Sequence, residues 1–264
     1  MITLNSDAAS TSLSKTTKAI LNEYGIKLNK NLGQNYLIDR NKRDQIIQFG
    51  NLTKDDVVLE IGPGIGTLTI ELAKRVKKVI AIEQDSNICQ ILENRLKKEN
   101  IDNVELINDD ALNVEFPKFD KIISNLPYQI SSPITFKFLN YDFQLAILMY
   151  QKEFASRMNG KVGSKDYSRL SAMLYFKCDV DLLTGISAES FIPKPKVDST
   201  VVRLTPKLPE LNGQLKHLNI NEINEKDFKT YSKFVKALFQ HRNKKVKNAL
   251  IDSRHIITCL LYTS

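Results

Sequence analysis

The chain alternates short apolar segments with segments of helical spacing, and this alternation limits the fold more than any other feature of the sequence. Each apolar segment has about the length of one buried strand. We expect strands at residues 56–61, 79–83, 104–108, 119–124, 143–150, 181–188 and 197–204. Strands that alternate with helices form βαβ units and a parallel sheet, so an α/β fold is predicted. The last two strands are joined by a short, proline-rich connection, which predicts an antiparallel pair.

The same spacing predicts helices and a domain boundary. The helices are expected at residues 15–25, 40–49, 67–75, 86–99, 132–139, 151–158 and 167–177. Residues 1–14 are rich in Ser and Thr and are expected to be disordered. Prolines just after residue 205 begin a polar linker, so we predict a large domain over 15–205 and a small helical, basic domain over 206–264. We expect this small domain to be incomplete. Its first helix is expected to carry an apolar stripe of Phe234, Ala237 and Leu238.

The positive charge of the chain is concentrated toward its C-terminus. The formal net charge is +8, and residues 206–264 hold 11 Lys and Arg against 5 Asp and Glu. A nearly neutral body with a basic tail suits a polyanionic partner, although a solvated helix face explains the same charges. The densest basic run, and therefore the predicted contact with that partner, is Arg242, Lys244, Lys245 and Lys247.

Composition argues against several other classes of protein. No apolar run reaches the roughly 18 residues of a membrane span, and the first residues lack the pattern of a secretory signal. The 3 cysteines lie far apart and the 3 histidines form no ligand pattern, so neither a disulfide framework nor a metal site is predicted. We expect a cytoplasmic protein that makes no membrane contact.

A glycine-rich loop follows the first predicted strand. Gly62, Gly64 and Gly66 alternate with other residues between a strand and a helix, where the backbone can approach a ligand closely. Glu83 ends the next strand, where a carboxylate can accept hydrogen bonds from the hydroxyls of a ribose, and Asp110 follows the third strand. Three such positions at neighbouring strand ends predict a nucleoside cofactor, although a tight strand–helix turn also uses glycine. The loop alone fits a nicotinamide dinucleotide or S-adenosylmethionine.

The stretch Asn125-Leu126-Pro127-Tyr128 comes directly after a buried apolar strand. An amide, a proline and an aromatic ring at this point suit a planar substrate that carries hydrogen-bond donors. Asn125 offers a side-chain carbonyl, Pro127 fixes a turn that leaves the Leu126 carbonyl unpaired, and Tyr128 offers a ring face for stacking. An ordinary Asn-Pro turn closed by a half-buried tyrosine explains the four residues equally well. If they hold an amino-bearing base, they favour S-adenosylmethionine over a nicotinamide cofactor.

Together these segments resemble the ribosomal RNA adenine dimethyltransferases, over roughly residues 15–250. Four segments carry the resemblance in order along the chain: Lys30–Asp39, Val58–Thr69, Asn125–Tyr128 and Phe191–Ser199. The resemblance implies a Rossmann-like S-adenosylmethionine-dependent methyltransferase domain with a mostly parallel, seven-stranded sheet, followed by a small helical domain that binds RNA. Tyr36 departs from the family pattern, which usually has Phe there.

The resemblance also implies roles for individual residues. The cofactor pocket would be lined by Gln34, Asn35, Leu37, Gly62, Gly64, Glu83, Asp110 and Asn125. Asn125 and the Leu126 carbonyl would hold the target amine, and Tyr128 and Phe191 would sandwich the adenine. Core packing is the alternative explanation for Phe191. The implied substrate is small-subunit ribosomal RNA, or an immature small ribosomal subunit, bound by a monomer that acts in ribosome biogenesis.

Three other functions remain open at this point. A related methylase of large-subunit ribosomal RNA, of the macrolide-resistance type, usually has Ile at the position of Leu126 and a different residue at that of Gly33. A DNA adenine methyltransferase would need a target-recognition domain that the sequence does not suggest. An assembly or transcription factor could keep the same fold and bind RNA without catalysis.

Overall fold

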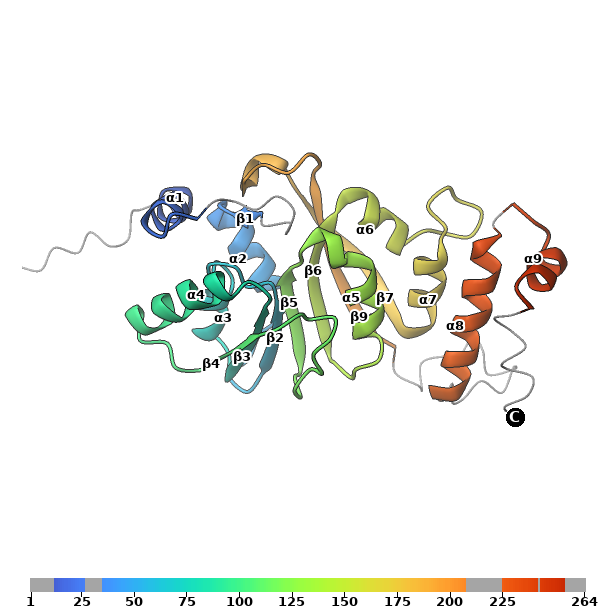
Figure 1. The fold of residues 1–264 in the computed structure, drawn as a ribbon, viewed down its shortest axis with the longest axis horizontal. Helices are drawn as coiled ribbons and strands as arrows, with labels where there is room; N and C mark the ends of the chain where they lie inside the picture. The colour runs from blue at the N-terminus through green and yellow to red at the C-terminus, as the bar shows by residue number, and fades with distance from the viewer. Residues whose placement is uncertain (1–11, 27–34, 208–224, 242, 255–264) are drawn as a thin grey trace, which may run out of the picture. The chain divides into compact units, whose positions relative to one another are not determined.

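The computed structural model describes residues 12–26, 35–207, 225–241 and 243–254 (Figure 1). Its helices are α1 Leu13–Glu23, α2 Arg40–Phe49, α3 Thr69–Ala73, α4 Ser86–Lys98, α5 Ser131–Phe138, α6 Lys152–Met158, α7 Arg169–Lys177, α8 Glu225–Gln240 and α9 Val246–Asp252, with 3-10 turns η3 Tyr128–Ile130 and η4 Ala188–Ser190. Its strands are β1 Tyr36–Leu37, β2 Val57–Ile61, β3 Lys78–Glu83, β4 Val104–Asn108, β5 Lys121–Asn125, β6 Leu145–Gln151, β7 Cys178–Ile186, β8 Phe191–Ile192 and β9 Ser199–Pro206. Within these ranges no helix is both long and apolar enough to cross a lipid bilayer.

Seven strands form the central sheet, in the order β4-β3-β2-β5-β6-β9-β7. The pairs from β4 to β6 are parallel, whereas β9 runs antiparallel to β6. The predicted seven-stranded, mostly parallel α/β sheet is therefore confirmed. The last two strands are neighbours, as expected, and their antiparallel orientation stays a prediction.

The chain reverses its direction of travel through the sheet between β2 and β5. From β2 it passes outward through β3 to β4, and then returns to the other side of β2 at β5. In an open α/β sheet, ligands bind at such a switch point, beyond the carboxyl ends of the strands. The residues after β2, β3, β4 and β5 therefore surround the expected binding crevice.

The first strands and helices form for reasons that are visible in the sequence. In β2 every residue from Val58 to Ile61 is buried, as expected for a central parallel strand. Helix α4 begins where the Asp85 carboxylate accepts hydrogen bonds from the amides of Asn87 (2.9 Å) and Ile88 (3.3 Å), and it ends with three basic residues in its last turn. Figure 1 shows α3 and α4 beside β3 and β4.

A second sheet, which the sequence analysis did not predict, joins the two ends of the large domain. In it β1 pairs antiparallel with β8, so that Tyr36 lies opposite Ile192 and Leu37 opposite Phe191. Strands of two residues are too short to produce an alternating pattern of hydrophobic residues. Helix α1 also differs from expectation: it begins at Leu13, within the segment expected to be disordered, because the Ser12 hydroxyl caps its first turn.

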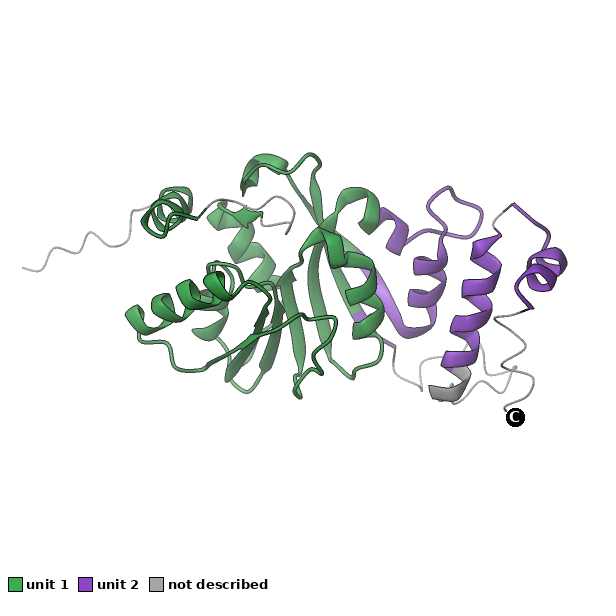
Figure 2. Ribbon diagram, in the orientation of Figure 1, with its two compact units in different colours: residues 1–155, 182–204 green, residues 156–181, 205–264 purple. Residues whose placement is uncertain are grey.

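Contacts within the chain define two compact units (Figure 2). The first comprises residues 1–155 and 182–204, and the second comprises residues 156–181 and 205–264. This division differs from the two predicted domains, because residues 156–181 group with the C-terminal part of the chain. Within the second unit the Tyr231 hydroxyl of α8 donates to the Ala172 carbonyl of α7 at 2.9 Å.

The predicted apolar stripe of α8 is partly wrong. Ala237 is fully buried, but Phe234 is exposed, with 36% of its surface accessible. Leu238 is half-buried. Two residues outside the predicted stripe, Phe228 and Val235, are buried as well; they are seven positions apart and therefore lie on one face of the helix. The Phe176 ring of α7 packs against Tyr231, which lies on the same face of α8. This contact explains why that face of the helix is buried.

Candidate functional site

A cleft of about 200 Å³ lies at the switch point of the sheet. Ten of the residues proposed from the sequence line it: Asn35, Leu37, Gly62, Gly64, Glu83, Asp110, Asn125, Leu126, Pro127 and Tyr128. They come from β1 and from the carboxyl ends of β2, β3, β4 and β5, so the fold brings together residues that lie up to 93 positions apart. Gln34, the remaining proposed cofactor ligand, falls outside the described residues.

The glycine loop can pass close to its neighbours only because Gly62 and Gly64 lack side chains. Gly62 and Gly64 have φ angles of +68° and +55°, in the left-handed region. A Cβ atom on Gly62 would lie 3.0 Å from the Pro127 ring, and one on Gly64 would lie 2.9 Å from Cε1 of Tyr36. The loop is therefore in direct contact with the Asn125–Tyr128 turn on one side and with β1 on the other.

Glu83 fixes the glycine loop from the end of β3. Its Oε2 atom accepts a hydrogen bond from the Gly64 amide at 3.2 Å, and its Oε1 atom accepts one from the Asp85 amide at 3.1 Å. Burial raises the pKa of Glu83. Each carboxylate oxygen can accept a further hydrogen bond, so the side chain can still receive the hydroxyls of a ribose.

Asp110 begins a short turn after β4. Its Oδ1 atom accepts a hydrogen bond from the Leu112 amide at 2.9 Å, and its Oδ2 atom accepts one from the Asn113 side chain at 3.1 Å. These bonds hold the carboxylate at the cleft. Asp110 follows β4, and the glycine loop follows β2, which is separated from β4 by one strand.

Asn125 is the last residue of β5, and its side-chain amide is oriented by a hydrogen bond. The Nδ2 atom donates to the Asn35 carbonyl at 3.0 Å. A carbonyl can only accept, so the amide nitrogen must face Asn35 and the Oδ1 atom is left as an acceptor. The Leu126 carbonyl accepts no hydrogen bond from the described part of the chain. Two carbonyl acceptors therefore follow one another at the end of β5.

Tyr128 is held by its hydroxyl group. The hydroxyl lies 2.6 Å from Oγ of Ser199, the first residue of β9, and burial raises the pKa of the tyrosine. This hydrogen bond leaves the ring with little rotational freedom, and the ring is half-buried at the cleft. A fixed aromatic ring beside two carbonyl acceptors suits a planar base that carries an amino group.

Phe191 lies in the hydrophobic core and does not line the cleft. Only 2% of its surface is exposed, and it packs in the same core cluster as Leu37, its partner in the small sheet. The core-packing interpretation accounts for this position. Its role as the second wall around a base stays a prediction.

The sequence analysis missed Glu60, a buried carboxyl group that lines the cleft. It lies within β2 with 2% of its surface exposed, and its Oε2 atom has no hydrogen-bond partner among the described residues. Burial, together with the charge of Glu83, raises the pKa of Glu60 to about 8. The only signal in the sequence was a single carboxylate in an otherwise apolar strand, which is costly unless a ligand or a proton neutralises it.

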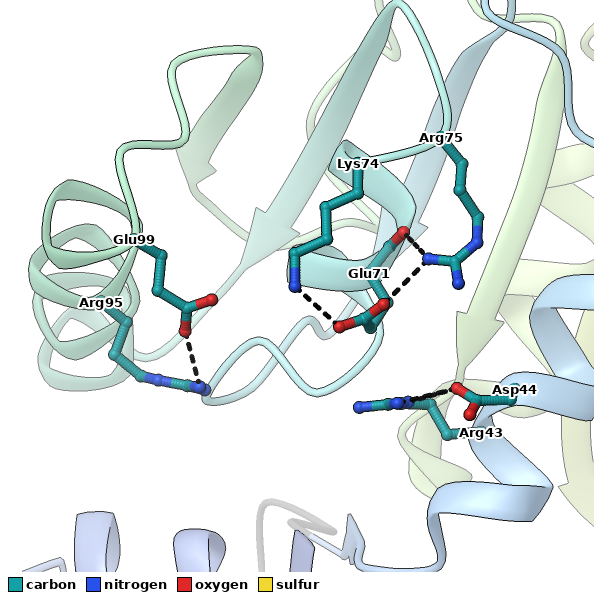
Figure 3. A network of polar contacts seen from close by, with 7 residues as sticks. All are labelled: Arg43, Asp44, Glu71, Lys74, Arg75, Arg95 and Glu99. Carbon is teal, nitrogen blue, oxygen red and sulfur yellow. Dashed lines mark hydrogen bonds and ion pairs between the residues drawn. The ribbon is translucent and has the colours of Figure 1, made fainter. Parts of the chain in front are cut away.

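A second hollow, of about 780 Å³, lies on the other side of the glycine loop and is rich in charged side chains. Figure 3 shows the ion pairs around it: Arg43–Asp44 (2.8 Å), Lys74–Glu71 (2.9 Å), Arg75–Glu71 (2.9 Å) and Arg95–Glu99 (3.4 Å). Arg95 also donates to the Ile65 carbonyl, within the glycine loop. These charges are thus accounted for by mutual pairing and by support of the loop.

The predicted basic run lies between the end of α8 and the first turn of α9. Helix α8 ends at Gln240, and Lys245 has extended backbone angles at the start of α9. Lys244 forms an ion pair of 2.5 Å with Asp252, whereas Lys245 and Lys247 are exposed and form no ion pair within the described residues. Arg242 lies outside the described residues.

Comparison with known proteins agrees with the sequence motifs. The sequence pattern of a family described as ribosomal RNA adenine dimethylase matches residues 25–256. A protein of Methanosphaera stadtmanae named "Probable ribosomal RNA small subunit methyltransferase A" is 51% identical over 239 residues, which cover 90% of this chain and 83% of that protein. Its namesake in Methanothermobacter thermautotrophicus is 47% identical over 241 residues, covering 91% of this chain and 81% of that protein.

Two solved structures are similar over most of the chain. A dimethyladenosine transferase from Plasmodium falciparum has a TM-score of 0.71 and 34% identity, with 85% of this chain and 77% of that chain covered. The 23S rRNA methyltransferase ErmE has a TM-score of 0.64 and 29% identity, with 83% and 84% covered. The small-subunit relatives are thus the more similar in sequence.

Proposed function

This chain belongs to the ribosomal RNA adenine dimethylase family, and on that premise we propose that it dimethylates N6 of two adjacent adenosines near the 3′ end of small-subunit ribosomal RNA. It is an rRNA methyltransferase with a Rossmann-like fold. The observation that carries the proposal is the oriented Asn125 amide: its oxygen, the Leu126 carbonyl and the Tyr128 ring border the same cleft as the glycine loop.

The residues of the cleft fit S-adenosylmethionine as the methyl donor. Gly62 and Gly64 line the cleft with backbone alone, and Glu83 and Asp110 supply acceptors for a ribose and an adenine amino group. The unpartnered oxygen of Glu60 suits an ammonium group such as that of the methionine portion. When bound, S-adenosylmethionine supplies an electrophilic methyl group on a sulfonium ion.

Asn125 and Leu126 activate the target by the geometry they impose on its nitrogen. The N6 lone pair of adenine is delocalised into the ring and is a poor nucleophile. Acceptors at Asn125 Oδ1 and the Leu126 carbonyl hold the two N–H hydrogens and favour a tetrahedral nitrogen, whose lone pair then points out of the ring plane. Positioning for in-line attack supplies most of the catalysis. No general base is needed before attack, because the methylated amine is cationic and releases its proton readily.

The substrate must present an unstacked adenosine. A base inside a helix cannot reach Tyr128 and the two carbonyl acceptors together, so a single-stranded or loop segment of RNA is the expected target. The large-subunit alternative is less favoured, because ErmE is 29% identical to this chain whereas the small-subunit relatives reach 51%. Dimethylation rather than monomethylation, the monomeric state and a role in ribosome biogenesis belong to the proposal.

Transfer of a labelled methyl group tests the proposed function. Immature small subunits should accept label, whereas large subunits and naked DNA should not, and the product should be N6,N6-dimethyladenosine. Asn125→Ala should lower turnover roughly 10²-fold, as expected for the loss of one preorganised polar group. Turnover within about threefold of the unmodified protein would remove Asn125 from the catalytic role, and preferential labelling of large subunits would favour the alternative.

A further inference from the structure

The turn that carries Asp110 has a cation at its carbonyl end. Residues 110–114 form one turn, in which the amides of Asn113 and Val114 donate to the Asp110 carbonyl at 2.9 and 3.1 Å. The carbonyls that face the other way belong to Ala111, Leu112 and Val114. Such carbonyls have no partner inside a single turn and need an external donor when they are removed from water.

Lys137 of α5 supplies that donor. Its Nζ atom donates to the carbonyls of Ala111 (2.9 Å), Leu112 (3.3 Å) and Val114 (2.5 Å), which uses all three of its hydrogens. The ammonium group also lies 4.3 Å from the centre of the Phe116 ring. Burial lowers the pKa of Lys137, whereas the carboxylates of Glu115, Asp110 and Asp109 act in the opposite direction.

The three hydrogen bonds of Lys137 all go to the backbone of residues 111–114, so they act directly on the turn that carries Asp110. Asp110 and Ala111 both line the cleft, and the ammonium group holds the carbonyl end of their turn. Asp109, Asp110 and Glu115 place three negative charges close together on this loop, and Lys137 offsets their repulsion. Helix α5 itself begins directly after η3, which contains Tyr128, so one helix connects the target side of the cleft to the Asp110 side.

We propose that Lys137 is a positioning residue that holds the Asp110 turn in the conformation that binds the adenine end of the methyl donor. The proposal rests on the proposed function for the identity of that ligand. Lys137 touches neither the donor nor the target and acts only through the backbone of residues 111–114. Its loss should therefore weaken binding of the adenosine portion without changing the chemistry at Asn125.

The test compares Lys137→Met, which keeps an unbranched side chain as far as the ε carbon and removes the ammonium, with Lys137→Arg, which keeps a cationic donor. Calorimetry should show about tenfold weaker binding of S-adenosylmethionine to Lys137→Met. This factor corresponds to the lower end of the free energy that a hydrogen bond to a charged group contributes. Binding of 5′-methylthioadenosine, which has the adenosine portion but no methionine portion, should weaken by the same factor. Lys137→Arg should recover most of the loss.

Two further measurements separate positioning from loss of stability. The KM for S-adenosylmethionine should rise about tenfold in Lys137→Met, while kcat at saturation stays within twofold. Amide hydrogen exchange at residues 110–116 should be faster in the ligand-free variant, while exchange in the glycine loop is unchanged. If Lys137→Met does not fold, Lys137→Gln carries the same comparisons.

Tyr141→Phe is the matched control. The Tyr141 hydroxyl accepts from the Phe116 amide at 3.3 Å and donates to Glu115 at 2.7 Å, so it supports the far end of the same loop. This variant should lose stability but keep its affinity for both ligands within twofold. Unchanged affinity in Lys137→Met, or an equal loss in Tyr141→Phe, overturns the positioning role. If the unmodified protein binds no S-adenosylmethionine, the proposed function is wrong, and S-adenosylmethionine is then also wrong as the ligand that Lys137 helps to bind.

Discussion

The side-chain amide of Asn125 has two different ends, and the structure commits one of them. The nitrogen donates to the Asn35 carbonyl, which fixes the direction of the side chain, and the oxygen is the acceptor that we propose for the target amine. A carboxylate at this position would keep an acceptor oxygen but would repel the Asn35 carbonyl. The requirement for an amide therefore comes from tertiary structure as much as from chemistry.

Glu60 should make the stability of the ligand-free protein depend on pH. Its pKa is about 8 in the folded protein, against 4.5 for an ordinary glutamate. Between pH 4.5 and pH 8 the folded state therefore keeps a proton on Glu60 that the unfolded state has lost. This contribution to stability is fully present below about pH 4.5 and is lost as the pH rises through about 8. Glu60→Gln removes the titration and should melt at a higher temperature than the unmodified protein at pH 8.5.

Melting curves recorded from pH 5 to pH 8.5 check this prediction. The difference in melting temperature between Glu60→Gln and the unmodified protein should grow with pH. A constant difference would mean that Glu60 is already ionised at pH 5. Glu93→Gln controls for the change in net charge, because Glu93 is exposed and forms no ion pair within the described residues.

At the scale of elements, the glycine loop is in direct contact with the Asn125–Tyr128 turn. We propose that the loop binds the methyl donor and that the turn binds the target base, so this contact joins the two proposed binding sites. Gly62 and Pro127 touch closely enough that a Cβ atom would lie 3.0 Å from the proline ring. Gly62→Ala should therefore both strain the loop and displace the turn. Left-handed backbone costs an alanine about 1–2 kcal/mol, and the contact with Pro127 should add to this value and lower methyl-transfer turnover.

Gly25→Ala provides the matched comparison, because Gly25 has a φ angle of +59° and no atom lies within 4 Å of its Cβ position. Chemical unfolding of both variants measures the two costs, and the difference between them isolates the contact with Pro127. Equal destabilisation together with unchanged turnover in Gly62→Ala would show that the two loops are not coupled.

At the scale of the whole molecule, the cleft and the basic run belong to different compact units. Lys245 and Lys247 are exposed, whereas the charge of Lys244 is partly compensated by the ion pair with Asp252. The double variant Lys245→Ala with Lys247→Ala should lower the slope of log RNA affinity against log salt by about 0.7–0.9 for each phosphate that the variant no longer neutralises. Lys244→Ala should change the slope less, because its charge is partly compensated.

A salt titration of RNA binding measures these slopes. Lys233→Ala with Lys236→Ala removes the same charge from exposed positions on α8 and is the control. Affinity for S-adenosylmethionine should stay unchanged in both double variants. Equal slopes in the two double variants would mean that the run is an ordinary solvated surface.

The order of elements and the membership of the cleft could be predicted from the sequence. Apolar strands alternating with helices predict a parallel sheet, and the carboxyl ends of parallel strands meet at one edge. Gly62, Glu83, Asp110 and Asn125 could therefore be placed together from their positions after successive strands, although two of them are 63 positions apart. The glycine pattern predicted a close approach of the backbone to a ligand, which stays a prediction, whereas the close contacts of Gly62 and Gly64 with Pro127 and Tyr36 were not predicted.

Contacts between distant segments were decided only by the tertiary structure. No local pattern predicts that Leu37 pairs with Phe191, that Asn125 is oriented by Asn35, or that Lys137 supports the Asp110 turn. Periodicity reports which face of an element is buried, but it carries no information on which other element covers that face. The sequence by itself therefore determined the sheet and the set of chemical groups at its edge, while side-chain packing decided the orientation of each group and the partner that holds it.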